Sequence, residues 1–179
     1  MADHRSADLI SVFNRLFSVH FNTRLVRGSN EPIYLPANSI TQYHQIIFAH
    51  GYFSSALHEI AHWCVAGEKR RQQEDYGYWY MPDGRNAQQQ SEFEQVEVKP
   101  QALEWIFSFS CAKKFSVSVD NLNGEQTNSR LFKAAVYKQV LHYCEQGLPE
   151  RADLFYRGLC QFYHRPDVLL GQLFSLADC

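Results

Sequence analysis

The sequence predicts an α+β protein: a predominantly helical single domain with a small sheet. The chain has 179 residues, which fits one domain, and it shows no repeat, low-complexity tract or linker. Apolar residues recur at helical spacing over most of its length. Short strand-like runs bounded by turn residues occur only in the first third. We therefore expect one domain over residues 1–179.

The first third is expected to hold one helix and three short strands. Ser6 and Asp8 can start a helix whose apolar positions follow the helical period. These positions are Leu9, Val12, Phe13, Leu16 and Phe17. The run TRLVRGSNEPIYLP (23–36) predicts strand, turn and strand around Gly28-Ser29-Asn30, and HQIIFAHG (44–51) predicts a third strand ending at Gly51.

The run SSALHEIAHW (54–63) predicts the next helix. Ser54 or Ser55 offers an N-cap, and Gly67 is a plausible stop. The helix would bury a stripe formed by Leu57, Ile60, Ala61, Cys64 and Val65.

Two further patterns describe the middle and the end of the chain. DYGYWYMPDGR (75–85) predicts an extended aromatic segment closed by a Pro82-Asp83-Gly84 turn. Residues 88–113 read as helical with a break near Pro100, which can occupy the first turn of a new helix. Helices are then expected from Ser129 to Gly147 and after Pro149, with one or two turns in the tail.

Composition and charge exclude several classes of protein. The net charge is -2 and the pI is near 6.4, so no overall field attracts nucleic acid or anionic membrane. Five cysteines without a C-x-x-C pair argue against a disulfide scaffold and favour a reducing compartment. The start, MADHRSADLISVF, is too polar for a secretion signal, and no apolar run reaches membrane-spanning length. We expect a cytoplasmic protein with no nucleic-acid or membrane partner.

His58, Glu59 and His62 form an H-E-x-x-H motif within the predicted helix. Residues four apart lie on one helix face, so the two histidines can share a metal ion. Imidazole suits zinc, iron, copper and nickel, so the pair does not select the metal. The alternative is a pair of structural histidines, but the placement on an amphipathic helix favours a metal site.

The third ligand must come from elsewhere. Val65 and Glu68 stand where a longer zinc motif would have its glycine and third histidine, so a carboxylate is expected. We prefer Glu97, which lies just before Pro100, where a helix packing against the metal helix would begin. Glu104, seven residues later, is the runner-up metal ligand because it can face the same way.

The remaining carboxylates of SEFEQVEVKPQALEW (91–105) are Glu92 and Glu94, which we assign to a solvated face. Two histidines and one carboxylate leave open positions, which fits catalytic zinc and equally the facial triad of non-haem iron oxygenases. Glu59 is our candidate catalytic residue, and its role separates these alternatives. It would be the general base of a peptidase but a supporting hydrogen-bond partner in an oxygenase. The motif alone favours the peptidase.

Four blocks of sequence, NTRLVRGSNEPIYLPA, FAHGYFSSALHEIAHWCVAG, DYGYWYMPDGR and FEQVEVKPQALEW, together resemble the bacterial elongation factor P hydroxylase family. The resemblance covers about residues 22–110. It implies hydroxylation of the lysine of elongation factor P that already carries a β-lysyl group. It also implies a metal held by two histidines and a carboxylate, which map here to His58, His62 and, in our interpretation, Glu97. The domain would then be a single metal-dependent hydroxylase domain.

Hydroxylating an unactivated C–H bond needs a redox-active metal with positions open to dioxygen. Zinc has no redox chemistry, so the resemblance implies an oxidoreductase with Fe(II), although zinc is a possible occupant. The H-x-[DE]…H pattern of 2-oxoglutarate oxygenases is not found, which leaves the electron donor open.

Asp75 and Tyr76 are our hypothetical substrate contacts. The lysylated side chain carries ammonium groups, and carboxylates and aromatic faces bind such groups. The alternative is that both belong to a structural hairpin with packed aromatics.

Other polar residues receive weaker assignments. Arg85 could hold a carboxylate ligand or bind the partner protein, although a plain surface arginine is the commoner case. We expect a structural role for His50 and assign none to His142 or His164. A third, non-enzymatic interpretation makes the metal a structural staple in an interaction module. Structural zinc normally has four protein ligands, so an open position argues against it.

Overall fold

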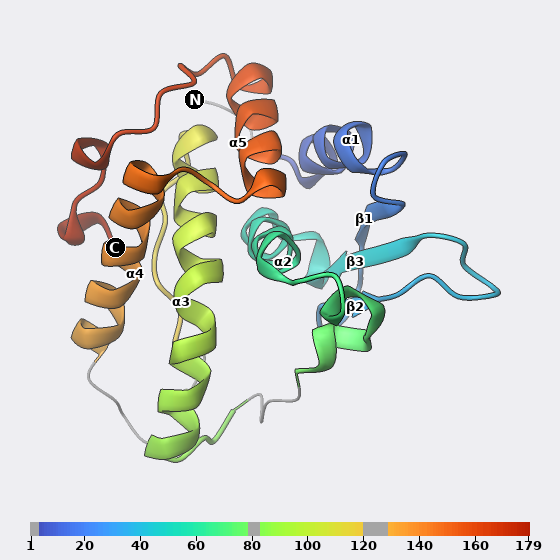
Figure 1. Cartoon of the computed structure of the whole chain (residues 1–179), viewed down its shortest axis with the longest axis horizontal. Coiled ribbons are helices and arrows are strands. Elements are labelled where there is room, and N and C mark those ends of the chain that lie inside the picture. Colours follow the sequence, from blue (N-terminus) through green and yellow to red (C-terminus); the bar gives the residue numbers. More distant parts are fainter. Residues whose placement is uncertain (1–3, 79–82, 120–128) are drawn as a thin grey trace.

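The computed structural model describes residues 4–78, 83–119 and 129–179. Within these residues the chain forms five α-helices and a three-stranded sheet, which confirms a mostly helical fold with a small sheet (Figure 1). In chain order the elements are α1 (Ser6–Phe17), β1 (Thr23–Arg27), β2 (Ile33–Leu35), β3 (His44–Phe48), α2 (Phe53–Val65), α3 (Ala87–Ser110), α4 (Ser129–Gln146) and α5 (Glu150–Phe162). Among the described residues no helix combines the length and apolar character that a membrane crossing requires.

The three strands have the order β1-β3-β2, with β1 parallel and β2 antiparallel to β3. The predicted strands around the 28–30 turn therefore exist, but they do not pair with each other, because β3 lies between them. β3 ends at Phe48 and not at Gly51. A short 3-10 turn follows it, in which His50 and Gly51 have φ of 50° and 75°.

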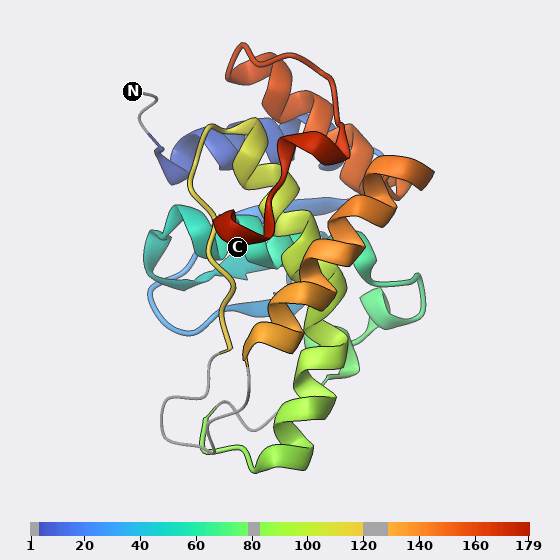
Figure 2. The same ribbon diagram turned by 90° about the vertical axis from the view of Figure 1, so that its left-hand side faces the viewer.

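Helix α2 lies between the sheet and α3 (Figures 1 and 2). Its predicted stripe is buried except for Val65, which is 36% exposed because the helix ends there. The predicted serine cap is wrong: Tyr52 precedes the helix without a side-chain cap. The Ser55 hydroxyl instead accepts a hydrogen bond from Ala49 N at 2.9 Å, which ties the helix to the end of β3.

The carboxyl end of α2 is fixed by two arginines. Arg71 and Arg151 both donate to the carbonyl oxygen of Ala66, at 2.7 and 2.6 Å. Positive charge at this end interacts favourably with the partial negative charge of the helix terminus. Arg151 also lies over the ring of Trp63, 4.6 Å from its centroid. The Trp63 ring also makes edge-to-face contacts with an aromatic group formed by Phe13, Phe17 and Phe21.

The predicted break at Pro100 is wrong, because α3 runs without interruption from Ala87 to Ser110. Asn86 starts it with a capping box that involves Gln89. Proline inside a helix removes one hydrogen bond and costs about 3 kcal/mol. Here the residues after it, including Pro100 itself, are largely buried against the other helices, and this packing outweighs the local cost.

Helices α4 and α5 confirm the predicted starts near Ser129 and Pro149, and Gly147, with φ of 88°, ends α4. Residues 112–119, called the strap below, run beside α3 without forming a helix or strand (Figure 2). The buried Phe115 anchors the strap by stacking on Trp105, with ring centroids 5.3 Å apart.

The predicted extended aromatic segment is wrong at its start. Glu74–Gly77 form a 3-10 turn in which Asp75 and Tyr76 have φ of 44° and 59°. The turn is held because the Asp75 carboxylate accepts from Tyr34 N at 2.7 Å and the Tyr76 ring stacks on Tyr34 at 4.4 Å. Pro82 of the predicted closing turn lies outside the described residues.

Candidate metal centre

Three of the predicted metal ligands meet where α2 crosses α3. His62 Nε2 lies 3.0 Å from Glu97 Oε1, and His58 Nε2 lies 3.5 Å from Glu97 Oε2. The two histidine Nε2 atoms are 3.0 Å apart. All the ligand atoms of this group lie within 4.8 Å of one another. The residues come from α2 and from the middle of α3, both of which are fixed by the core packing.

These distances fit three ligands of one metal ion. Two ligand atoms each about 2.1 Å from a metal, at angles of 90–109°, lie about 3.0–3.4 Å apart. Two imidazoles and one carboxylate bind zinc or first-row transition metals. The side chains could therefore close on one ion with small adjustments.

Glu104 takes a different position from Glu97. Its Oε2 lies 2.9 Å from His58 Nδ1, on the opposite side of the ring from the ligand group. With Nδ1–H donated to this carboxylate, Nε2 is the nitrogen that points at His62 and Glu97, where it can hold a proton or a metal ion. A carboxylate on the second nitrogen is a common partner of a metal-bound histidine, since it fixes the tautomer and ring orientation. Glu97 and Glu104 thus share a helix face, as predicted, but contact different nitrogens of one ring.

The electrostatics of the site favour positive charge. Burial alone would raise the pKa of Glu97, but His62, His58 and the Gln101 amide hold it at about 2. Burial would lower the pKa of His58, but its hydrogen bond to Glu104 and the charges of Glu97, Glu104 and Glu59 raise it to about 10. The carboxylates therefore stabilise a cation at this point, whether a proton on His58 or a bound metal ion.

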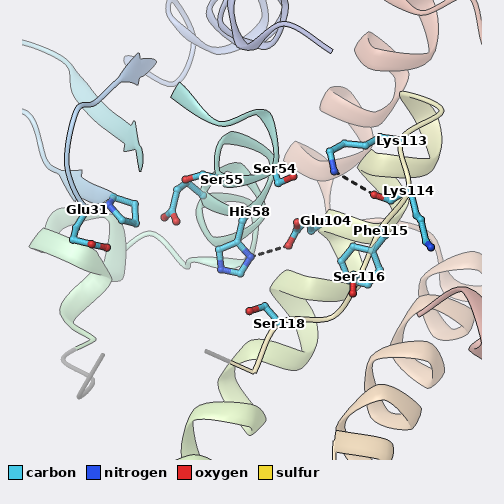
Figure 3. A pocket seen from close by; sticks show the side chains of 12 residues that line it. Glu31, Ser54, Ser55, His58, Glu104, Lys113, Lys114, Phe115, Ser116 and Ser118 are labelled. Carbon is cyan, nitrogen blue, oxygen red and sulfur yellow. Dashed lines mark hydrogen bonds and ion pairs between the residues drawn. The ribbon is translucent and has the colours of Figure 1, made fainter. Parts of the chain in front are cut away.

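A cleft of about 660 Å³ opens onto His58. Figure 3 shows His58 with Glu31 on one side and Glu104 and the strap on the other. The cleft is lined by the following residues of the turn after β1, of α2, of α3 and of the strap: Glu31, Pro32, Ser54, Ser55, His58, Glu59, Glu104, Lys113, Lys114, Phe115, Ser116 and Ser118. The candidate metal group therefore borders this cleft at His58.

Comparison with known proteins decides between the families that use such a site. A family model described as elongation factor P hydroxylase matches residues 12–173. A protein of Haemophilus influenzae named elongation factor P lysine hydroxylase is 53% identical over 165 residues, which are 92% of this chain and 93% of that protein. The chain belongs to the elongation factor P hydroxylase family. The resemblance seen in the sequence blocks is thereby confirmed.

Glu59, the predicted catalytic residue, lines the cleft together with His58 and is not part of the ligand group. Its pKa is raised, chiefly by burial, which outweighs the opposing effect of His58 and His62. A carboxylate in this place can contact a bound substrate. Its catalytic role stays a prediction.

Asp75 and Tyr76, the predicted substrate contacts, are not among the described residues that line the cleft. Both are occupied with Tyr34, and Tyr76 is buried. These contacts correspond to the structural alternative, although substrate contact by either residue stays a prediction.

Arg85 is not the surface arginine that we considered the commoner case. It is 2% exposed, lies over Phe93 at 3.9 Å and donates to Gln90 Oε1 and Val119 O. His50 is exposed and its ring lies 5.5 Å from that of Tyr52. The later histidines, His142 and His164, are exposed.

Sequence reasoning missed Glu31, Gln101 and the strap. Glu31 reaches the cleft only because the turn after β1 folds toward α2. Gln101 lies one helical turn after Glu97, and that spacing was the only available signal of a partner for the ligand carboxylate. The strap has no periodic pattern that could have placed it.

Proposed function

We propose that this protein is an oxidoreductase that hydroxylates the lysylated lysine of elongation factor P, with a metal ion bound by His58, His62 and Glu97. The observation that carries the proposal is the convergence of these three side chains beside a cleft open at His58. Family membership supports the substrate, because the Haemophilus relative is named for action on a lysine of elongation factor P. Residues 1–179, of which 12–173 match the family model, would form a single hydroxylase domain.

The donor set suits Fe(II) as well as zinc, and the proposed reaction selects iron. A redox-active ion with open positions supplies the activation of dioxygen that no side chain provides. In the balanced reaction one oxygen atom enters a C–H bond to give C–OH. The other leaves as water, with two electrons and two protons from an external reductant.

The side chains of the protein hold and orient the reactants. Glu104 keeps the proton on His58 Nδ1, so that Nε2 serves the metal. The cleft volume of about 660 Å³ has room for a long side chain, and its carboxylates Glu31 and Glu59 can pair with the ammonium groups of the lysyl extension. Lys113 and Lys114 place positive charge at the strap side, where an acidic surface of the partner protein would meet it.

The peptidase alternative rests on the H-E-x-x-H motif alone, and the family comparison supports hydroxylation instead. In a peptidase Glu59 would activate metal-bound water. In a hydroxylase its position in the cleft suits a substrate contact.

The proposal is tested by the intact mass of lysylated elongation factor P after aerobic incubation with the protein, Fe(II) and ascorbate. We expect a gain of one oxygen atom. His58→Ala should abolish the gain and bind no metal, because it removes a ligand. The control His142→Ala alters an exposed histidine of α4 and should behave like the unaltered protein. An unchanged mass with metal-replete protein, or a fully active His58→Ala variant, would refute the proposal.

A further inference from the structure

Gln101 is a buried polar side chain that contacts both the ligand carboxylate and the strap. It is 1% exposed. Its Nε2 lies 2.7 Å from Ser118 O and 3.3 Å from Glu97 Oε2. Its Oε1 accepts from Ser118 N at 3.0 Å. One side chain thus joins a wall of the cleft to the proposed metal centre.

The two bonds to Ser118 fix the orientation of the amide. The Ser118 N–H can only donate, so it faces Oε1, and the Ser118 carbonyl can only accept, so it faces the NH₂ group. The second N–H of that group is then directed at Glu97 Oε2. The main chain of the strap therefore determines where the hydrogen bond to the ligand carboxylate points.

Gln90 provides an internal comparison. It lies on the same helix, is fully buried, and donates from Nε2 to Val119 O at 3.1 Å. Its other contacts are with Arg85 and Glu94, at 2.9 and 3.1 Å, so it holds the strap without contacting the ligand group. Both glutamines donate to the strap, but the second acceptor of the amide is Glu97 for Gln101 and Glu94 for Gln90.

We propose that Gln101 is a positioning residue, which orients Glu97 for the metal ion according to how the strap is seated on α3. This inference rests on the metal centre of the proposed function. The strap lines the cleft with Lys113, Phe115 and Ser118, so a substrate that presses on it acts on the same hydrogen bonds that orient Glu97. Partners of this kind typically change metal affinity by 10–100-fold when they are removed.

The test is titration of the metal-free protein with Co(II), followed by its visible absorption, which responds to ligand geometry. Gln101→Met keeps the length of the side chain but removes the hydrogen bonds. It should weaken Co(II) binding about tenfold or more and shift the absorption bands. Gln90→Met loosens the strap from the same helix. It should lower the melting temperature about as much as Gln101→Met does. It should leave the Co(II) affinity and the absorption bands unchanged.

The outcomes separate this inference from the proposed function. If the unaltered protein fails to bind Co(II), the proposed metal centre of His58, His62 and Glu97 is refuted. If it binds and Gln101→Met binds equally well with the same bands, the positioning role is wrong. Equal losses in the two glutamine variants would also overturn the role.

If Gln101→Met does not fold, Ser118→Pro provides the test. It removes the N–H that Gln101 Oε1 accepts, at an exposed position outside the helices. It should weaken Co(II) binding a few-fold, and unchanged affinity would overturn the inference.

Discussion

The two faces of α2 are built on different principles. One face carries Leu57, Ile60 and Trp63, each fully buried in the apolar core. The other carries His58, Glu59 and His62, which are partly exposed and contact or face charged groups. The apolar face supplies stability, and the polar face carries the proposed metal ligands at an electrostatic cost.

The difference shows how the site is kept rigid. The candidate ligands His58 and His62 do not need to hold the helix, since Trp63 and the arginines at Ala66 already fix its position. The polar face is therefore free to tolerate three acidic groups near two histidines. A change on one face should leave the property supplied by the other largely intact, and the predictions below test this independence.

The largest effect is expected from Trp63→Ala. The side chain is fully buried among Phe13, Phe17 and Phe21, so its removal leaves a large cavity. The free energy of unfolding should fall by about 3–5 kcal/mol, measured by denaturant titration. Val65→Ala, on the exposed end of the same helix, should change it by less than about 0.5 kcal/mol.

The folded fraction of Trp63→Ala should still bind metal with nearly unaltered affinity. If the variant keeps its stability, the buried face does not carry the fold as described. If the folded fraction loses metal, the two faces are not independent.

The apolar face was predictable from sequence because its signal is local. Leu57, Ile60, Ala61 and Cys64 recur at the helical period, and burial follows from that period alone. Local signals failed where tertiary contacts override them. Pro100 predicted a break that the packing of α3 prevents, and Asp75 lies in a left-handed turn stabilised by its bond to Tyr34.

The polar face was predictable only in part. The spacing of His58 and His62 predicted a shared metal ion, and the carboxylates of residues 91–105 were the candidates for a third ligand. Glu97 was preferred because a helix was expected to begin near Pro100, but no helix begins there. The distinction between Glu97 and Glu104 depends on which nitrogen of His58 each one meets, and no sequence pattern encodes this. The cleft residues Glu31 and Ser118 come from loops whose path is set by long-range contacts.

An intermediate effect is expected from Glu104→Gln, which tests the support of the polar face. The amide can still accept from His58 Nδ1–H but removes the negative charge that strengthens the ligand. Metal affinity should fall about tenfold, with little change in stability, as measured by competition with a chelator. Glu92→Gln, on the exposed side of the same helix, should have no effect.

Complete loss of metal in Glu104→Gln, matching His58→Ala, would identify Glu104 as a ligand after all. Unaltered affinity would show that the bond to Nδ1 does not matter for the metal centre.

The smallest effect is expected from Glu59→Gln. Glu59 belongs to the polar face by sequence, but it lines the cleft and lies outside the ligand group. Metal affinity should be unchanged, and kcat/KM for oxygen insertion into lysylated elongation factor P should fall no more than about tenfold. Removal of a general base typically costs 10²–10⁴-fold. A loss of that size in kcat with metal still bound would mean that Glu59 transfers a proton in the reaction. The polar face would then contribute a catalytic group as well as two ligands, and the motif would keep in a hydroxylase the role it has in peptidases.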